Sequence, residues 1–294
     1  MTHRAFLERV NSGEVLVSDG ATGTNLQHMG LPGGMVAEAW VLERPDQIKA
    51  LNQAFIEAGA DILLTCTFGA TRLRLATGGL ADQFEAVNRK AVEVTRAAVA
   101  GRDVFVAGSI GPLGHMLAPL GQVTAEEAEE NFRDQAALLC EAGVDLIVVE
   151  TQFDLKEASA AIRGVRSVDT AIPLVCSFSY DRGTRTMMGV SPEGMAAEIS
   201  PLGVDLLGIN CGQSLEDNLA ALSLLRAATD KPLWFKPNAG LPVAGPDGEA
   251  TYTLTPEEMG AMVPTWIEAG ARVVGGCCGT SPEHLAEITR AAHA

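Results

Sequence analysis

The fold is indicated by the run EAGVDLIVVE at residues 141–150, in which a helix end, a glycine and a mostly apolar stretch follow one another. Glycine at a helix end commonly takes the left-handed conformation that ends the helix, and the short apolar run after it is typical of a buried strand. The same junction recurs as EAGADILLT (57–65), PLGVDLLGIN (201–210) and EAGARVVGG (268–276). These repeats predict a chain that alternates helices and strands.

Weaker versions of this junction complete a set of eight candidate strands. They are EVLVSDG (14–20), GRDVFVAGS (101–109), AIPLVCSFS (171–179) and KPLWFKPN (231–238). Near-continuous apolar runs are typical of parallel strands that helices cover on both faces. Eight units give about 37 residues each, which suits a (β/α)8 TIM barrel of the α/β class. An open doubly wound sheet is the alternative. No linker separates a second domain, so we expect residues 1–294 to form one barrel domain.

Helix starts support this reading. Residues 45–60 begin with Pro45, which is favoured in a first helical turn, and carry an apolar stripe made of Ile48, Leu51 and Phe55. Thr124 is followed three residues later by Glu127, the pattern of a capping box. Residues 238–255, rich in Gly and Pro, predict a long loop after the seventh strand, and loops of that length are often functional.

Composition narrows the functional class. The 37 acidic residues outnumber the 21 basic ones and give a net charge of −16, which repels nucleic acid and anionic lipid. The N-terminus lacks the apolar segment of a signal peptide, and no apolar run is long enough to span a membrane. We therefore expect a cytoplasmic protein with small-molecule substrates. The six cysteines are then expected to be thiols, available for metal binding or chemistry.

Three of these cysteines lie at strand ends, where the chemistry of a barrel is located. Cys211 ends the sixth strand in GINCG, and the pair Cys277 and Cys278 ends the eighth in GGCCGT. Thiols from these two strand ends could converge on one ion. Zinc favours tetrahedral thiolate ligation, and three protein ligands leave a fourth position open for a substrate. The pattern predicts a catalytic zinc site.

A substrate thiol in that open position would become reactive. A free thiol is mostly protonated at neutral pH, whereas a metal-bound thiol loses its proton and becomes a nucleophile. The competing interpretation is that the cysteines are buried and structural, since cysteine is among the most buried residue types. That interpretation suits Cys140 and Cys176, leaves Cys66 undecided, and explains the glycine-framed pair poorly.

Together, GINCG and GGCCGTSPEHL resemble the zinc signature of the homocysteine S-methyltransferase family. Further matching blocks are SDGATGTNLQ (18–27), EAGADILLTCTFGA (57–70), GSIGPLG (108–114), ETQFDLKEA (150–158) and KPNAG (236–240). Within the family, the chain is more similar to the homocysteine-binding module of cobalamin-dependent methionine synthase than to betaine–homocysteine methyltransferase.

The resemblance implies that homocysteine, bound to zinc as its thiolate, accepts a methyl group and becomes methionine. It implies that Asp19 and Glu150 bind the substrate's ammonium group, although Asp19 could instead cap the following turn. It assigns the carboxylate to the backbone amides of Gly20, Ala21 and Thr22. Asn210, next to Cys211, would orient the site or fill the open zinc position before the substrate arrives.

The methyl donor is left open by the sequence. A betaine, a sulfonium compound and a separate corrinoid protein are all compatible with the pattern, and Trp40 and Phe68 are the aromatic candidates for contacting a quaternary ammonium group. Lys236 could contact a donor or a neighbouring acid. Two other functions remain as alternatives: a zinc-binding paralogue without activity, and a methyltransferase acting on another thiol or a selenol.

Overall fold

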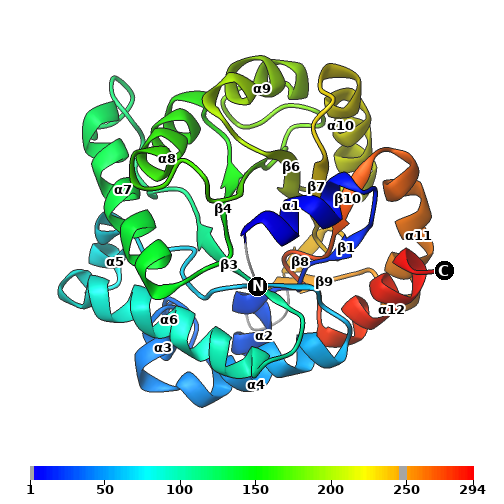
Figure 1. The fold of residues 1–294 in the computed structure, drawn as a ribbon, viewed down its shortest axis with the longest axis horizontal. Helices are drawn as coiled ribbons and strands as arrows, with labels where there is room; N and C mark the ends of the chain where they lie inside the picture. The colour runs from blue at the N-terminus through cyan, green and yellow to red at the C-terminus, as the bar shows by residue number, and fades with distance from the viewer. Residues whose placement is uncertain (1–2, 245–249) are drawn as a thin grey trace.

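The computed structural model of the chain describes residues 3–244 and 250–294. Eight parallel strands curve into a barrel that helices surround (Figure 1). Neighbouring strands follow the order β1-β10-β7-β6-β5-β4-β3-β2, and a bridge between Ser18 and Ile62 joins the two ends of this order. The predicted (β/α)8 barrel is therefore confirmed, and the open doubly wound sheet is excluded. The strands are β1 (Leu16–Val17), β2 (Ile62–Leu64), β3 (Phe105–Ile110), β4 (Leu146–Gln152), β5 (Leu174–Phe178), β6 (Leu206–Cys211), β7 (Leu233–Pro237) and β10 (Ala271–Val274).

The helices between these strands start where the sequence predicted. Thr124 and Glu127 form the expected capping box, and the stripe side chains predicted for residues 45–60 are buried. None of the helices in the described residues is long and apolar enough to cross a membrane. They are α1 (His3–Asn11), α2 (Thr22–His28), α3 (Ala39–Glu43), α4 (Pro45–Glu57), α5 (Arg72–Thr77), α6 (Phe84–Val99), α7 (Ala125–Ala142), α8 (Leu155–Val168), α9 (Pro192–Ile199), α10 (Leu215–Ala228), α11 (Pro256–Glu268) and α12 (Pro282–Ala292), with short 3-10 turns η1 (Ala81–Gln83) and η2 (Ser200–Leu202).

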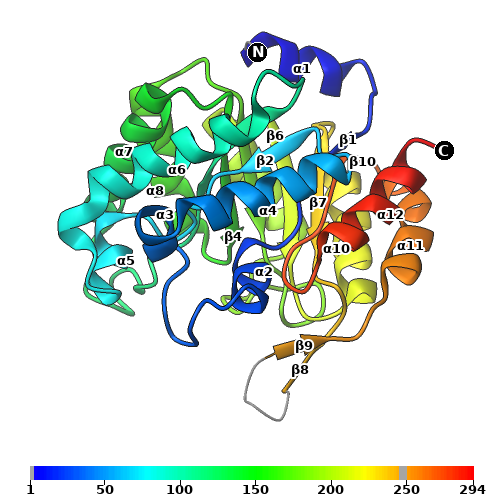
Figure 2. The ribbon, with the colours of Figure 1, turned by 90° about the horizontal axis from the view of Figure 1, so that it is seen from below.

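The two ends of the barrel differ. Helix α1 lies across one end, and the β8–β9 pair projects from the other (Figure 2). On α1, Phe6 and Val10 are buried against the side chains that fill the barrel interior, and the Phe6 ring meets Phe105 edge-on at a centroid distance of 5.5 Å. Because α1 closes the end where the strands begin, the opposite end, where they finish, remains available for a site.

The predicted loop at residues 238–255 contains regular structure that the sequence did not indicate. Strands β8 (Pro242–Ala244) and β9 (Ala250–Tyr252) pair antiparallel. The expectation of an irregular loop is therefore corrected, because these two segments satisfy their backbone groups through each other. The part of the predicted loop at residues 245–249 lies outside the described residues.

Replacing Thr124 with alanine is expected to lower the free energy of unfolding by about 1 kcal/mol, because the side chain accepts a hydrogen bond from the Glu127 amide at the start of α7. Urea unfolding followed by circular dichroism measures this loss. Thr124→Ser keeps the accepting oxygen and should retain most of the stability. Equal losses in the two variants would contradict the capping role.

Candidate metal centre and the cavity around it

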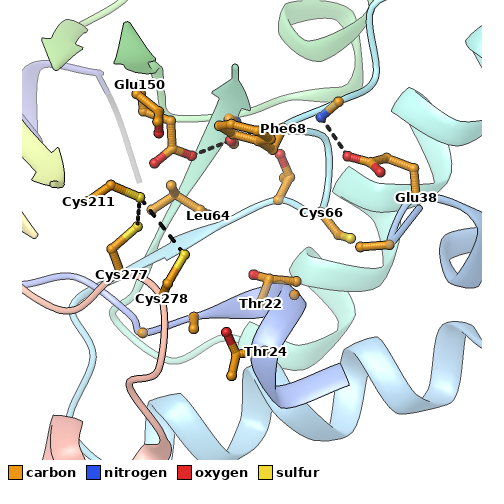
Figure 3. A pocket seen from close by; sticks show the side chains of 18 of the residues that line it. Thr22, Thr24, Glu38, Leu64, Cys66, Phe68, Glu150, Cys211, Cys277 and Cys278 are labelled. Carbon is orange, nitrogen blue, oxygen red and sulfur yellow. Dashed lines mark hydrogen bonds between the residues drawn. The ribbon is translucent and has the colours of Figure 1, made fainter. Parts of the chain in front are cut away.

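Three thiols meet at the open end of the barrel. Cys211 is the last residue of β6, and Cys277 and Cys278 lie just after β10. The Cys211 Sγ lies 2.9 Å from the Cys277 Sγ and 3.9 Å from the Cys278 Sγ, and all three sulfurs lie within 4.8 Å of one another (Figure 3). In a tetrahedral zinc site with Zn–S bonds of 2.3 Å, sulfurs stand about 3.8 Å apart. The Cys211–Cys278 pair of free thiols has this spacing, and the Cys211 and Cys277 sulfurs would move apart by about 0.9 Å to share one zinc ion.

Gly275 and Gly276, which precede the cysteine pair, allow this segment to lie close to the neighbouring chain. A Cβ atom on Gly275 would lie 2.5 Å from the Ser18 carbonyl oxygen, and one on Gly276 would lie 2.4 Å from the Thr280 side chain. A larger residue at Gly275 would push the segment away from the residues that follow β1, and one at Gly276 would clash with Thr280. The Cys277 amide also donates to the Pro237 carbonyl, which ties the pair to the end of β7.

Asn210 holds the neighbouring strand ends together. Its Oδ1 accepts hydrogen bonds from the Thr151 amide at 2.9 Å and the Ser177 hydroxyl at 2.7 Å. Its Nδ2 donates to the Thr151 hydroxyl at 2.7 Å and faces the Cys277 Sγ at 3.8 Å. Because the Asn210 Oδ1 already accepts two hydrogen bonds, the geometry favours a role for Asn210 in orienting the site over a role as a metal ligand. Thr151 and Cys211 both have left-handed backbones, with φ of 59° and 58°, a strained conformation that accumulates at functional sites.

Asn238 is a residue to which the sequence analysis assigned no role. Its Nδ2 donates to the Gly212 carbonyl at 2.7 Å, while its Oδ1 is buried without a hydrogen-bond partner in the described part of the chain. Its neighbour Ala239 donates to the Cys278 carbonyl, so Asn238 is anchored beside the cysteine pair. Burying an unpaired oxygen costs free energy unless a ligand satisfies it. The signal in the sequence was its position in KPN at a strand end.

Glu150 brings a buried carboxylate to the same cavity (Figure 3). It is 7% exposed and accepts a hydrogen bond from the Ser109 hydroxyl. Burial raises the pKa of Glu150 to about 7, even though the Lys236 ammonium opposes this shift. A buried carboxylate of this kind is stabilised in its ionised form by a cationic partner.

The Asp19 carboxylate is paired with other groups of the protein. Its Oδ1 pairs with the Lys236 Nζ at 2.6 Å, and its Oδ2 accepts from the Leu64 amide at 2.8 Å. It is not among the residues that line the cavity. Burial would lower the pKa of Lys236, but Asp19 and Glu150 outweigh burial and raise it, so the lysine is a cation. Both carboxylate oxygens of Asp19 thus have protein partners, and the predicted contact between Asp19 and the substrate stays a prediction. Of the two options for Lys236, contact with a neighbouring acid is the observed one.

The cavity has a volume of about 360 Å³. Gly20, Ala21 and Thr22 line it together with the next two residues of α2. The Ala21 amide, however, donates to the Thr280 carbonyl at 3.2 Å and to the Thr280 hydroxyl at 3.0 Å. This amide thus has two protein acceptors, and the predicted binding of the substrate's carboxylate by the amides of Gly20, Ala21 and Thr22 stays a prediction. Helix α2 begins at Thr22 without a side-chain cap, and its first three residues line the cavity.

The far end of the cavity is made of residues that lie beyond the strand ends, together with Cys66 and Phe68, which follow the second strand. They are Val36, Ala37, Glu38, Cys66, Phe68, Gly69, Arg74 and Leu75. Glu38 is buried and accepts from the Gly69 amide at 2.5 Å. The Arg74 guanidinium lies 5.5 Å from the centre of the Phe68 ring. Of the two aromatic candidates, only Phe68 lines the cavity, because Trp40 is buried under the Arg44 guanidinium.

The remaining cysteines are separate from the trio. Cys66 is buried and lines the far end of the cavity, which settles its location. Cys176 is buried within β5, and Cys140 is half-buried on α7. Both have the structural positions that the sequence predicted for them.

Residues 16–292 match the model of a protein family described as homocysteine S-methyltransferase. The chain is 32% identical over 293 residues to the methionine synthase of Mycobacterium leprae and 33% identical over 298 residues to that of Mycobacterium tuberculosis. These alignments cover 94% and 96% of this chain but 24% and 25% of the relatives. The chain thus spans about a quarter of the length of either relative.

Solved structures of a homocysteine methyltransferase are also similar to this chain over nearly its whole length. The metallated form of the homocysteine methyltransferase MmuM from Escherichia coli superposes with a TM-score of 0.81 at 28% identity, covering 98% of each chain. The apo form of MmuM has a TM-score of 0.75 at 26% identity, covering 95% of this chain and 96% of that one.

Proposed function

Because the chain belongs to the homocysteine S-methyltransferase family, we propose that it binds Zn²⁺ through Cys211, Cys277 and Cys278 and methylates homocysteine to methionine. The observation that carries this proposal is the convergence of three free thiols within 4.8 Å at the open end of the barrel. Asn238, whose Oδ1 is buried without a partner among the described residues, precedes Ala239, the residue that donates to the Cys278 carbonyl. Bound Zn²⁺ lowers the pKa of a substrate thiol, so that the thiol reacts as its thiolate at neutral pH.

The chain's own residues position the substrate. Glu150 binds the ammonium group of homocysteine, and the amides at the start of α2, which has no side-chain cap, receive its carboxylate together with Gly20. Asn210 keeps the strand ends that carry Thr151 and Cys277 in register with each other. Lys236 is ion-paired with Asp19 and also lines the cavity. Its positive charge compensates part of the negative charge of the thiolates.

The far end of the cavity provides space for a methyl donor. It extends past the thiols to Glu38, Phe68 and Arg74, which together offer an acidic, an aromatic and a basic group. A betaine, a sulfonium compound and a corrinoid carried by a separate protein are the donor classes to be tested.

Purified, zinc-loaded protein is expected to form methionine from homocysteine and one member of a donor panel: glycine betaine, S-methylmethionine or methylcobalamin. Methionine is quantified by mass spectrometry with isotope-labelled methyl groups. Cys278→Ala is the matched control and should form no labelled methionine, because it lacks one of the three thiols. Absence of labelled methionine with every donor would contradict the proposed function.

A further inference from the structure

The far end of the cavity holds a basic side chain without an ion-pair partner. Arg74 lines the cavity from α5, and its Nη1 donates to the Pro112 carbonyl at 3.3 Å. No carboxylate of the described residues lies within 4.0 Å of its guanidinium. A guanidinium has several N–H donors in a fixed fork, and within the described part of the chain the side chain makes no hydrogen bond besides this one. Arg74 therefore retains the capacity to bind an anion.

Close packing holds the Arg74 side chain in place. The guanidinium carbon lies 5.5 Å from the centre of the Phe68 ring. A Cβ atom on Gly69 would lie 3.2 Å from the Arg74 Nε, and one on Gly114 would lie 2.9 Å from its Nη1, so two backbone segments pack directly against the guanidinium. A side chain that is already ordered loses less conformational entropy when a ligand binds to it.

A buried acid stands close to Arg74 without pairing with it. Glu38 is 6% exposed, and its Oε1 accepts a hydrogen bond from the Gly69 amide. A Cβ atom on Gly69 would lie 2.9 Å from this Oε1 and 3.2 Å from the Arg74 Nε, which places Gly69 between the two groups. Burial raises the pKa of Glu38, so a cationic ligand group nearby would stabilise its ionised form. Two groups of opposite charge that are close but unjoined match a zwitterion better than a simple anion or cation.

The aromatic ring of the cavity lies between the reacting sulfur and these two groups. Figure 3 shows the thiol trio and Glu38 at opposite sides of the pocket, with Phe68 between them. The face of an aromatic ring attracts an onium group, that is, a quaternary ammonium or sulfonium cation. The cavity volume of about 360 Å³ is near the lower end of the range for small-molecule sites, so a donor held at the far end has to be small.

From this arrangement we infer that the methyl donor is a small onium carboxylate and that Arg74 binds its carboxylate. The inference rests on the proposed function, because the donor has to reach a homocysteine thiolate in the same cavity. In the transfer, the lone pair of the substrate sulfur forms an S–CH3 bond. The bond from that carbon to the onium nitrogen or sulfur breaks, and its electron pair stays with the departing amine or thioether. The carboxylate takes no part in these bond changes, so Arg74 binds it equally before and during the transfer.

A kinetic test compares Arg74→Gln with the unchanged zinc-loaded protein, using glycine betaine and S-methylmethionine as donors. The substitution is expected to raise the KM for the donor roughly tenfold to hundredfold, the range for losing a hydrogen bond between charged groups. The kcat should change by less than about threefold, because the lost contact is the same in the ground state and the transition state. Arg74→Lys keeps the charge without the two-pronged geometry and should give an intermediate KM.

Arg72→Gln is the matched control. Arg72 lies on the same helix but does not line the cavity, and its guanidinium carbon lies 4.4 Å from the centre of the Phe84 ring. This variant should keep the KM for the donor. Zinc content and homocysteine affinity should be unchanged in all three variants, which separates loss of the donor contact from loss of the fold.

A binding experiment isolates the carboxylate without turnover. The two ligands 3,3-dimethylbutyrate and 3,3-dimethylbutanol share the shape of a trimethyl onium compound, only the first carries a carboxylate, and neither can donate a methyl group. In isothermal titration calorimetry of zinc-loaded protein with homocysteine bound, the carboxylate should bind about tenfold more tightly than the alcohol, or better. Arg74→Gln should abolish this preference and Arg72→Gln should keep it. A preference that survives in Arg74→Gln, or no preference in unchanged protein, would overturn the inference.

Failure of this inference differs from failure of the proposed function. Methionine formed from methylcobalamin, but from neither glycine betaine nor S-methylmethionine, would contradict the inference and leave the proposed function standing. Absence of methionine with every donor would contradict the proposed function, and the calorimetric comparison would still decide whether Arg74 binds a carboxylate.

Discussion

Replacing Cys211 with alanine is expected to remove the metal and to lower methyl transfer by about a thousandfold or more, because activation of the substrate thiol requires the ion. The variant leaves two thiolates, from adjacent residues after β10, in place of three that converge from two strand ends. Zinc binding to thiolates contributes on the order of 10 kcal/mol, so loss of one of three protein ligands removes a large share of the affinity. Metal content by inductively coupled plasma mass spectrometry should fall from about one zinc per chain to nearly none.

Cys140→Ala is the control for this experiment. Cys140 is half-buried on α7 and does not line the cavity, so the variant should keep its zinc and its activity. A Cys211→Ala protein that retains stoichiometric zinc would show that the ion is held elsewhere.

The barrel and the thiol trio could be predicted from the sequence because their signals are local. Each helix-to-strand junction carries its own glycine, and Gly143 and Gly270 adopt the left-handed conformation that the pattern predicts, with φ of 90° and 103°. Once parallel strands are recognised, their carboxyl ends must meet at one end of the barrel. Cys211 and the pair after β10 were therefore expected to be neighbours without any knowledge of side-chain packing.

Which polar groups near the strand ends are already paired could not be predicted in the same way, because it depends on pairings between distant residues. Asp19 and Glu150 both stand at strand ends, yet Lys236 pairs with Asp19 and leaves Glu150 in the cavity. In the same way, the Ala21 amide is taken by Thr280, a residue 259 positions later in the chain. Sequence position alone does not tell which of two equivalent polar groups is already satisfied.

Residues outside the strand ends were missed for a different reason. Glu38 and Arg74 enter the cavity from a loop and from the short helix α5. Loops have no periodicity that would reveal which side chains point inward. Their contribution becomes visible only when the loops are placed over the barrel.

Replacing Glu150 with glutamine is expected to weaken homocysteine binding roughly 100-fold, or about 3 kcal/mol, the cost of removing one partner from a buried hydrogen-bonded charge pair. Isothermal titration calorimetry measures this loss. Glu157→Gln is the matched control: Glu157 is also buried, with a pKa raised to about 7 by burial, but it accepts from the Leu113 amide and does not line the cavity. Homocysteine affinity should be unchanged in Glu157→Gln.

The origin of the loss can be isolated with two ligands. 4-Mercaptobutyrate lacks the ammonium group, so Glu150→Gln should bind it nearly as well as unchanged protein does. An equal loss of affinity for homocysteine and for 4-mercaptobutyrate would mean that Glu150 acts on the metal centre and not on the ammonium group.

The pH dependence of methionine binding gives a second test, because methionine has no thiol proton to lose and reports on Glu150 alone. Because an ammonium group favours the ionised carboxylate and the pKa of Glu150 is about 7, methionine binding releases a proton below that pH. Its affinity should therefore rise as the pH increases from about 6 to 8, and this rise should be absent in Glu150→Gln.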